Sequence, residues 1–297
     1  MIFERLILGT AGIGGIWGPV EPAASVETVL LAMELGIGAI DTAPAYAQAE
    51  QFVGEALRQW RRPLPAISSK VGRLPGTTAY DGHYDYSRDA MFRSAAASLE
   101  KLGIPELDVL FLHDPAQIPQ NDFERVVEVM VELKDRGYAR HIGIGGNPPL
   151  YAWPWLVDDT FSVLMEYNRL NACHTPALET SLPAALAAGK RYYAASPLNM
   201  GALGRPFAEF SRNPPAWLPE SDITAARSLH QLAESEGLAL RTMAHRFLLS
   251  FPPEFNIVIG PSNPEELRAT LGDFTAGPLS APLFQKILQS SKEKSLT

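Results

Sequence analysis

Four polar residues have between them the side chains needed to move a proton at a carbonyl or hydroxyl oxygen: Asp41, Tyr46, Lys70 and His113. A tyrosine ordinarily has a pKa of about 10, too high for ready proton exchange at neutral pH. A lysine ammonium beside the tyrosine favours the phenolate, and a carboxylate keeps that lysine charged when it is buried. A histidine facing the tyrosine orients the substrate oxygen. The set predicts a proton-transfer site centred on Tyr46.

Each of these residues also has an ordinary structural explanation. Taken singly, each residue is more typical of its structural role: Asp41 of a turn cap, Tyr46 of a loop aromatic and His113 of a buried histidine with satisfied hydrogen bonds. Their positions favour the functional hypothesis, because all four fall at or just after the ends of consecutive predicted strands. The carboxyl ends of barrel strands surround one mouth, so a barrel would bring the four together.

Short apolar runs alternate with segments of helical period along the chain. The predicted strands are 5–8, 37–41, 66–70, 107–113, 140–145, 161–167, 191–196 and 256–260. The predicted helices are one capped by Ser25 and stopped by Gly36, and then 48–60, 87–102, 122–136, 176–188, 223–235 and 265–271. Several runs are apolar on both faces, as parallel strands covered on both sides require. The pattern predicts a (β/α)8 TIM barrel as a single domain over residues 1–297, with a C-terminal helix or tail at 279–297.

The main alternative fold is an open doubly wound sheet that binds a dinucleotide. Its G-x-G-x-x-G signature fails at both candidate positions, because the third place falls on Trp17 after Gly12 and on Pro148 after Gly143. Two long connections, 71–86 and 199–222, follow the third and seventh strands. Loops of this length are typical of active-site walls, although plain surface insertions also occur.

Aromatic side chains on the loops near the predicted mouth suit a sugar, because a sugar ring packs an apolar face on such groups. The candidates for a substrate pocket are Trp17, Tyr80, Tyr84 and Trp217.

Composition narrows the class of protein. The 297 residues include 25 basic and 33 acidic ones, for a net charge of −8, which argues against nucleic acid and anionic membranes as partners. A single cysteine, Cys173, excludes an internal disulfide and a cysteine-rich metal site. The N-terminus has no signal-peptide pattern, and no apolar run is long enough to span a bilayer. We expect a soluble cytoplasmic protein without metal, as a monomer or small homo-oligomer.

Three segments resemble the aldo-keto reductase family. Residues 38–50, followed by Val53 and Gly54, resemble its signature around the catalytic aspartate and tyrosine. Residues 68–72 resemble the strand with the family lysine, and 107–114 the strand with the family histidine. The four polar residues match the family's catalytic residues in identity and order. Further similar segments extend the resemblance over roughly residues 5–275, namely 142–147, 165–168, 195–201 and 257–262.

The resemblance implies an NAD(P)-dependent oxidoreductase that moves hydride between nicotinamide and a carbonyl carbon. By the same resemblance, the cofactor-binding positions are Asn147, Ser196, Leu198, Gly201, Gly260, Ser262 and Glu266. Residues 194–201 are similar to the aldose dehydrogenase branch, which includes L-galactose dehydrogenase and D-threo-aldose (L-fucose) 1-dehydrogenase.

Two positions bear on the choice of cofactor. Gly260 and Glu266 stand where family members that prefer NADPH commonly carry a lysine and an arginine. A carboxylate repels the 2′-phosphate, and the lost charge-assisted bond amounts to about 1.5–3 kcal/mol, so we expect NAD over NADP. Arg268 is a possible replacement, and Glu266 is equally typical of a solvated first helical turn.

We therefore expect oxidation of an aldose at C1 to a lactone with NAD. One alternative is an NADPH-dependent reductase of small aldehydes, including pyridoxal. Another, of a different class, is a non-catalytic subunit that senses the cofactor, against which the intact set of four residues argues.

Overall fold

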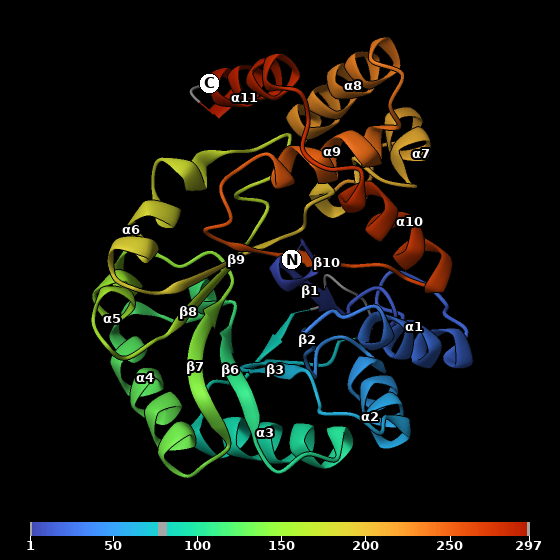
Figure 1. Ribbon diagram of the computed structural model, residues 1–297. Helices are drawn as coiled ribbons and strands as arrows, with labels where there is room; N and C mark the ends of the chain where they lie inside the picture. Colours follow the sequence, from blue (N-terminus) through green and yellow to red (C-terminus); the bar gives the residue numbers. More distant parts are fainter. Residues whose placement is uncertain (1, 77–81, 296–297) are drawn as a thin grey trace.

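A computed structural model describes residues 2–76 and 82–295. Within these residues, eight parallel strands close into a barrel in the order β1-β10-β9-β8-β7-β6-β3-β2. Figure 1 shows this barrel surrounded by helices. The strands are β1 (Leu6–Gly9), β2 (Ala39–Asp41), β3 (Ala66–Val71), β6 (Leu107–His113), β7 (Ala139–Gly145), β8 (Val163–Tyr167), β9 (Arg191–Ala195) and β10 (Asn256–Ile259). The predicted TIM barrel is confirmed.

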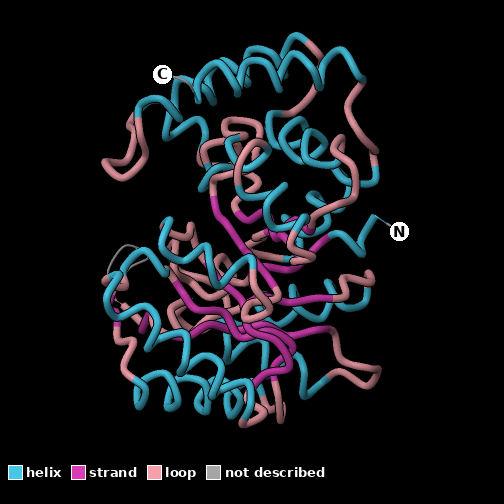
Figure 2. Tube along the Cα trace, turned by 90° about the vertical axis from the view of Figure 1, so that its left-hand side faces the viewer, coloured by secondary structure: helices cyan, strands magenta, loops and turns pink. Residues whose placement is uncertain are grey.

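Helices cover the outside of the strands, as the two perpendicular views show (Figures 1 and 2). They are α1 (Pro22–Glu34), α2 (Ala49–Gln59), α3 (Arg88–Leu102), α4 (Gln120–Asp135), α5 (Trp153–Val157), α6 (Ser181–Ala187), α7 (Phe207–Arg212), α8 (Glu220–Ser235), α9 (Leu240–Leu249), α10 (Pro264–Thr275) and α11 (Ala281–Ser295). The last of these, α11, lies at the edge of the molecule beside the C-terminus.

The predicted cap of the first helix is wrong. Helix α1 begins earlier, at Pro22, because proline suits the first helical position and the Glu21 carboxylate accepts a hydrogen bond from the backbone N–H of Ala23. Ser25 is buried and instead donates its hydroxyl to the carbonyl of Ile13, which ties α1 to the loop after β1.

Other differences from the predicted elements lie in the connections. Segment 176–188 is divided into a 3-10 turn at Pro176–Leu178 and helix α6, and helix α9 was not predicted. The connection after β3 contains an antiparallel hairpin of β4 (Arg73–Leu74) and β5 (His83–Tyr84). The connection after β9 contains a 3-10 turn at Asn199–Gly201 and helix α7.

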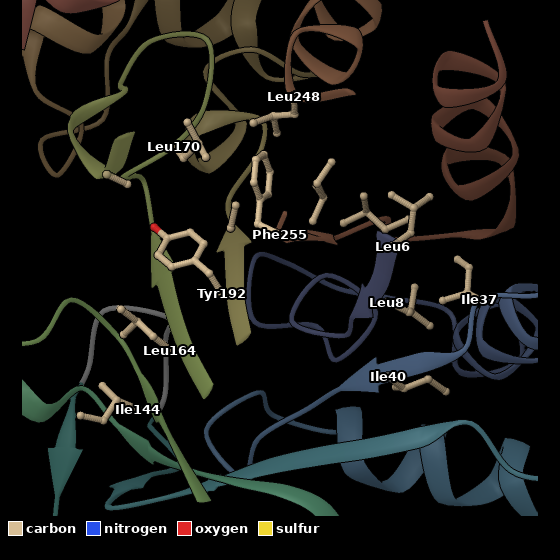
Figure 3. Close-up of a cluster of buried hydrophobic side chains, with 14 of the residues drawn as sticks. Leu6, Leu8, Ile37, Ile40, Ile144, Leu164, Leu170, Tyr192, Leu248 and Phe255 are labelled. Carbon is tan, nitrogen blue, oxygen red and sulfur yellow. The ribbon is translucent and has the colours of Figure 1, made fainter. Parts of the chain in front are cut away.

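The hydrophobic core has two layers. The larger layer lies between the strands and the helices, and Figure 3 shows part of it around Leu8, Ile40 and Leu248. A smaller cluster fills the barrel interior: Ile7, Val109, Phe111, Val163, Met165, Tyr193 and Val258. Phe111 needs a glycine opposite, because a Cβ on Gly143 would lie 2.7 Å from its ring.

Strand periodicity directs the polar residues into the barrel. Successive side chains of a strand point to opposite faces, so His113 lies on the same interior face of β6 as Val109 and Phe111. Lys70 is in register with Phe111 and its ammonium lies 5.8 Å from the centre of that ring. The barrel interior is therefore apolar at its centre and carries charge at the carboxyl ends of its strands.

Candidate active site

A buried ion pair joins the ends of β2 and β3. Lys70 Nζ donates to Asp41 Oδ2 at 2.5 Å and to the carbonyl oxygen of Thr42 at 2.8 Å. The side chains of Lys70 and Asp41 are only 2% and 3% exposed. The second carboxylate oxygen accepts a bond from the hydroxyl of Ser68 at 2.8 Å, so both oxygens of Asp41 are satisfied. Burial lowers the pKa of Lys70, but Asp41 and Tyr46 outweigh that effect and raise it.

Tyr46 lies above this pair in the loop between β2 and α2. The ammonium of Lys70 is 4.7 Å from the centre of the tyrosine ring. Burial raises the pKa of Tyr46 above its ordinary value, and the opposing influence of Lys70 is smaller. The expected effect of the lysine is present, but in this structure the phenol is kept protonated at neutral pH.

His113 faces Tyr46 from the end of β6. The two rings meet edge to face, with centres 5.9 Å apart and planes at 89°. Burial, with Lys70 and Arg73 nearby, lowers the pKa of His113 well below its ordinary value, so the imidazole is neutral. Its Nδ1 is buried and has no partner among the described residues. A neutral imidazole can hydrogen-bond an oxygen placed between it and the phenol.

The structure thus brings together all four residues on which the sequence hypothesis depends. They come from three strand ends and one loop, as the barrel topology requires. The arrangement contains one charged pair, one neutral phenol and one neutral imidazole, which is a set suited to proton transfer at an oxygen.

A second polar group at the mouth was not predicted. Arg73 Nη1 lies 3.0 Å from Asp114 Oδ2, and the hydroxyl of Tyr84 donates to the same oxygen at 3.3 Å. The hydroxyl of Tyr86 donates to the backbone carbonyls of His113 and Asp114, at 2.8 and 2.9 Å. The position of Asp114 directly after a strand-end histidine was an available signal, but the hairpin that brings Arg73 to it was not visible in the sequence.

Of the aromatic residues predicted to line a substrate pocket, Tyr84 lies near the catalytic candidates. Tyr84 is bonded to Asp114, the residue that follows His113, and so lies near the cluster of Asp41, Tyr46, Lys70 and His113. Its ring stacks on that of Tyr86, with the ring centres 6.1 Å apart. Trp217 packs edge-on against Phe210 of α7, and Trp17 is 50% exposed in the loop after β1. Tyr80 lies outside the described residues. A part for Trp17 and Trp217 in a substrate pocket stays a prediction.

The predicted cofactor-binding residue Asn147 lies close to the ends of β7 and β8. Asn147 Oδ1 accepts a bond from the backbone N–H of Tyr167 at 3.3 Å, which places this amide beside the end of β8. The next residue, Asn168, has a buried Oδ1 with no partner among the described residues. An orphaned acceptor beside a second amide fits a ligand that brings an N–H donor, as a carboxamide does.

The segment after β9 carries three of the predicted cofactor residues. Ser196, Asn199 and Met200 have left-handed φ angles of 60°, 48° and 54°, which is unusual for residues other than glycine, and Gly201 has a φ of 98°. Leu198 packs against the core, and its side chain would lie 3.2 Å from a Cβ on Gly204. The conformation is compact and strained, a feature typical of ligand-holding loops.

The remaining predicted cofactor residues lie between β10 and α10. Gly260 follows β10, and Ser262 lies so close to the loop after β1 that a Cβ on Gly12 would be 2.9 Å from its hydroxyl. Glu266 Oε2 accepts from the backbone N–H of Ser262 at 2.9 Å, and Oε1 lies 3.4 Å from Arg205 Nε. Arg268, by contrast, lies 4.0 Å from Glu27 of α1. The sequence hypothesis missed Arg205, which comes from the segment after β9.

No helix in the described parts of the chain is both long and apolar enough to cross a membrane. Across those same residues, no group of three or more His, Cys, Asp or Glu is placed to hold a metal ion.

The closed parallel barrel carries, at the carboxyl ends of its strands, a buried cluster suited to proton transfer at an oxygen, as in a TIM-barrel enzyme. Comparison with known families identifies the family: the chain belongs to the aldo/keto reductase family of oxidoreductases, whose sequence model matches residues 5–292. The resemblance inferred from the motifs is confirmed.

Individual relatives are more distant. The chain is 26% identical to pyridoxal 4-dehydrogenase of Microbacterium luteolum, over 88% of this chain and 86% of that protein. It is 27% identical to L-galactose dehydrogenase of Arabidopsis thaliana, over 90% and 83%. Among solved structures, the glycerol dehydrogenase of Gluconobacter oxydans superimposes with a TM-score of 0.75 at 22% identity, covering 96% of this chain and 90% of that one. The last similarity concerns the fold alone.

Proposed function

We propose that this protein oxidises an aldose at C1 to the lactone with NAD⁺. The observation that carries the proposal is the buried cluster of Asp41, Lys70, Tyr46 and His113, in which an ion pair of 2.5 Å supports a phenol that faces a neutral imidazole. A nicotinamide cofactor belongs to the proposal because family membership implies it and because the amides of Asn147 and Asn168 fit a carboxamide.

Each residue has a defined part in the proposed reaction. When bound, the nicotinamide supplies the acceptor for the hydride that leaves C1. His113 holds the anomeric hydroxyl, and Tyr46 as phenolate takes its proton, so that the C–O bond becomes the lactone carbonyl. Lys70 stabilises the phenolate, and Asp41 keeps Lys70 charged within the barrel.

The aldose as substrate rests on two further supports. L-Galactose dehydrogenase, a relative aligned over 90% of this chain, is named for the oxidation of an aldose. The mouth also carries hydroxyl and charged groups together with the exposed rings of Tyr84 and Tyr167, and that mixture suits a polyhydroxylated ring.

One observation favours a second candidate, the reduction of a small aldehyde with NADPH. Burial raises the pKa of Tyr46, so its resting form is a phenol, which is the proton donor that reduction requires. Pyridoxal is a small aldehyde, and the relative from Microbacterium luteolum is named as a pyridoxal dehydrogenase, so its name supports the substrate and not the reductive direction.

Initial rates separate these possibilities. The purified protein is assayed with a panel of aldoses and NAD⁺ or NADP⁺, and with small aldehydes and NADH or NADPH, by following the absorbance of the reduced cofactor. Oxidation of at least one aldose with NAD⁺ at a higher kcat/KM than any aldehyde reduction supports the proposal. The reverse order supports the second candidate.

A matched pair of variants tests the part of Tyr46. Tyr46→Phe is expected to lose nearly all turnover while NADH binding, measured by fluorescence titration, stays unchanged. Tyr138→Phe is the control, because Tyr138 packs edge-on against Phe92 on the outside of the barrel. Binding of NADH without turnover of any substrate by the wild-type protein would instead indicate a cofactor-sensing subunit.

A further inference from the structure

The backbone around Asp114 is held in an uncommon shape. Asp114 follows β6 directly and has a left-handed φ of 52°. Its N–H donates to the carbonyl of Gly145 at 2.8 Å, and the hydroxyl of Tyr86 bridges the carbonyls of His113 and Asp114. Tyr86 reaches them only because residue 72 is a glycine, since a Cβ there would lie 2.2 Å from its ring. Several contacts thus fix the direction of one carboxylate, which is typical of functional sites.

The two oxygens of the Asp114 carboxylate differ in their hydrogen bonds. Oδ2 accepts from both Arg73 and Tyr84, whereas Oδ1 accepts no hydrogen bond from the described residues. The side chains of Arg73 and Asp114 are 18% and 16% exposed, so the pair is neither sealed in the core nor free in solvent. A half-buried pair with an acceptor atom to spare is better suited to a ligand than to holding two elements together.

Asp114 lies within electrostatic reach of the proposed reaction centre. Its charge contributes to the raised pKa of Tyr46, and the charge of Lys70 acts in turn on the pKa of Asp114, which burial raises. The pKa of Tyr167, at the end of β8, is raised as that of Tyr46 is, by burial and by the charge of Asp114. The acidic group, the two phenols and the lysine therefore lie close enough to influence one another's charge at the carboxyl ends of the strands.

The chemistry of the pair selects a class of substrate. Neighbouring hydroxyls of a sugar both donate and accept, so a carboxylate oxygen and a guanidinium fork can bind them together. The exposed rings of Tyr84 and Tyr167 offer surface for the C–H face of the ring. The pair has no net charge, and its two partners match hydroxyl groups, so it fits a neutral polyol.

We propose that Arg73 and Asp114 form the subsite that binds the hydroxyl groups of a neutral aldose beyond its reacting carbon, and so set the preference for sugars over simple aldehydes. This inference rests on the proposed function and names the residues that read the substrate. Neither residue takes part in proton transfer, and their effect is on which molecule reaches Tyr46 and His113 in a productive position.

Substitution of Asp114 with a matched control tests the subsite. Asp114→Asn keeps the shape of the side chain and removes its charge. Asp108→Asn makes the same change at the other end of β6, where the carboxylate binds Arg140 and the backbone N–H of Ile67. Each variant is assayed with the best aldose, its 2-deoxy analogue and a small aldehyde without hydroxyls, and aldose binding to the NADH complex is measured by calorimetry.

For Asp114→Asn we expect kcat/KM to fall about 10- to 100-fold with the aldose and less than about threefold with the hydroxyl-free aldehyde. Aldose binding should weaken in parallel, and Asp108→Asn should change neither. Equal losses on all substrates, or no loss on the aldose, would overturn the subsite while leaving the proposed function standing. A wild-type protein that neither binds nor oxidises any aldose would overturn both.

Discussion

The ammonium of Lys70 lies 2.5 Å from Oδ2 of Asp41 at a depth where neither side chain is more than 3% exposed. Removal of two charges from water is costly, and it is offset only when the charges are paired and fully hydrogen-bonded. The bonds from Ser68 to Asp41 and from Lys70 to the carbonyl of Thr42 meet that condition. We therefore expect the reactivity of Tyr46 and the stability of the barrel to depend on the same pair.

Asp41→Asn is expected to lower both stability and turnover. The substitution leaves the Lys70 ammonium buried without a counter-charge, a change that typically costs about 3–5 kcal/mol of unfolding free energy. Denaturant unfolding measures this loss, and turnover should fall about 100-fold or more because Lys70 no longer stays charged beside Tyr46. Glu132→Gln, in an exposed pair with Arg88, should leave both quantities nearly unchanged. A stable and active Asp41→Asn variant would contradict the expectation that stability and turnover both depend on the Asp41–Lys70 pair.

The two directions of reaction should respond differently to pH. Burial raises the pKa of Tyr46, so the phenolate needed for oxidation is a minor species at neutral pH and grows about tenfold per pH unit below that pKa. The rate of oxidation should therefore rise through the alkaline range. Reduction uses the phenol, so its rate should stay level and fall only above the pKa. Initial rates with saturating cofactor in both directions provide the test, and an oxidation rate independent of pH would contradict it.

The sequence predicted the parts of the site that depend on strand ends. Strand β6 has the predicted bounds because it contains the apolar run Val109–Leu112, and the barrel then determines where His113 lies. Arg73 and Asp114 could not be paired in advance, since they are 41 positions apart and meet through a two-stranded hairpin within a predicted loop. Contacts of this kind follow from packing and not from local periodicity. Helix α9, by contrast, was missed although its sequence carries the signal: the buried apolar residues recur at helical spacing, namely Leu240, Met243, Ala244, Phe247 and Leu248.

Gly14→Ala should impair catalysis from outside the cluster of four. A Cβ at this position would lie 2.1 Å from the carbonyl oxygen of Tyr46 and 2.9 Å from Cβ of Ala49, so the loop that carries the phenol must move. A displacement of about 1 Å is enough to lower kcat about 10- to 100-fold. Gly38→Ala is the control, because a Cβ there meets nothing within 4 Å. Unchanged kcat in Gly14→Ala would show that the loop accommodates the methyl group.

Glu266 is expected to set the preference for NAD over NADP. Its carboxylate lies in the first turn of α10 and is bonded to the N–H of Ser262. Glu266→Gln keeps an acceptor for that N–H and removes the charge that repels a 2′-phosphate, so kcat/KM with NADP⁺ should rise about tenfold and that with NAD⁺ should change little. Glu265→Gln, one residue away, serves as the control. A wild-type protein that prefers NADP⁺ would refute the expectation and direct attention to Arg205, which lies 3.4 Å from Glu266.

Asp222 should control how tightly the cofactor is held, through the segment after β9. Asp222 Oδ2 accepts from Nδ2 of Asn199 at 2.9 Å and lies 3.1 Å from Nε2 of His174. Asn199 is fully buried and left-handed, and such residues cost about 1–3 kcal/mol each, so they persist only where other contacts hold them. Asp222→Asn removes the negative charge that strengthens both contacts to this side chain, which should loosen the segment that carries Ser196 and Leu198.

The Kd for NADH in Asp222→Asn should therefore rise about tenfold while kcat at saturating cofactor stays within about twofold. Fluorescence titration gives the Kd, and a thermal melt reports stability. Asp273→Asn is the matched control, because Asp273 is bonded to His245, Arg241 and Thr242 between α9 and α10, and its loss should lower Tm without changing the Kd. If both variants weaken NADH binding in proportion to their loss of Tm, the effect is general destabilisation. An unchanged Kd in Asp222→Asn would show that the loop keeps its conformation without this carboxylate.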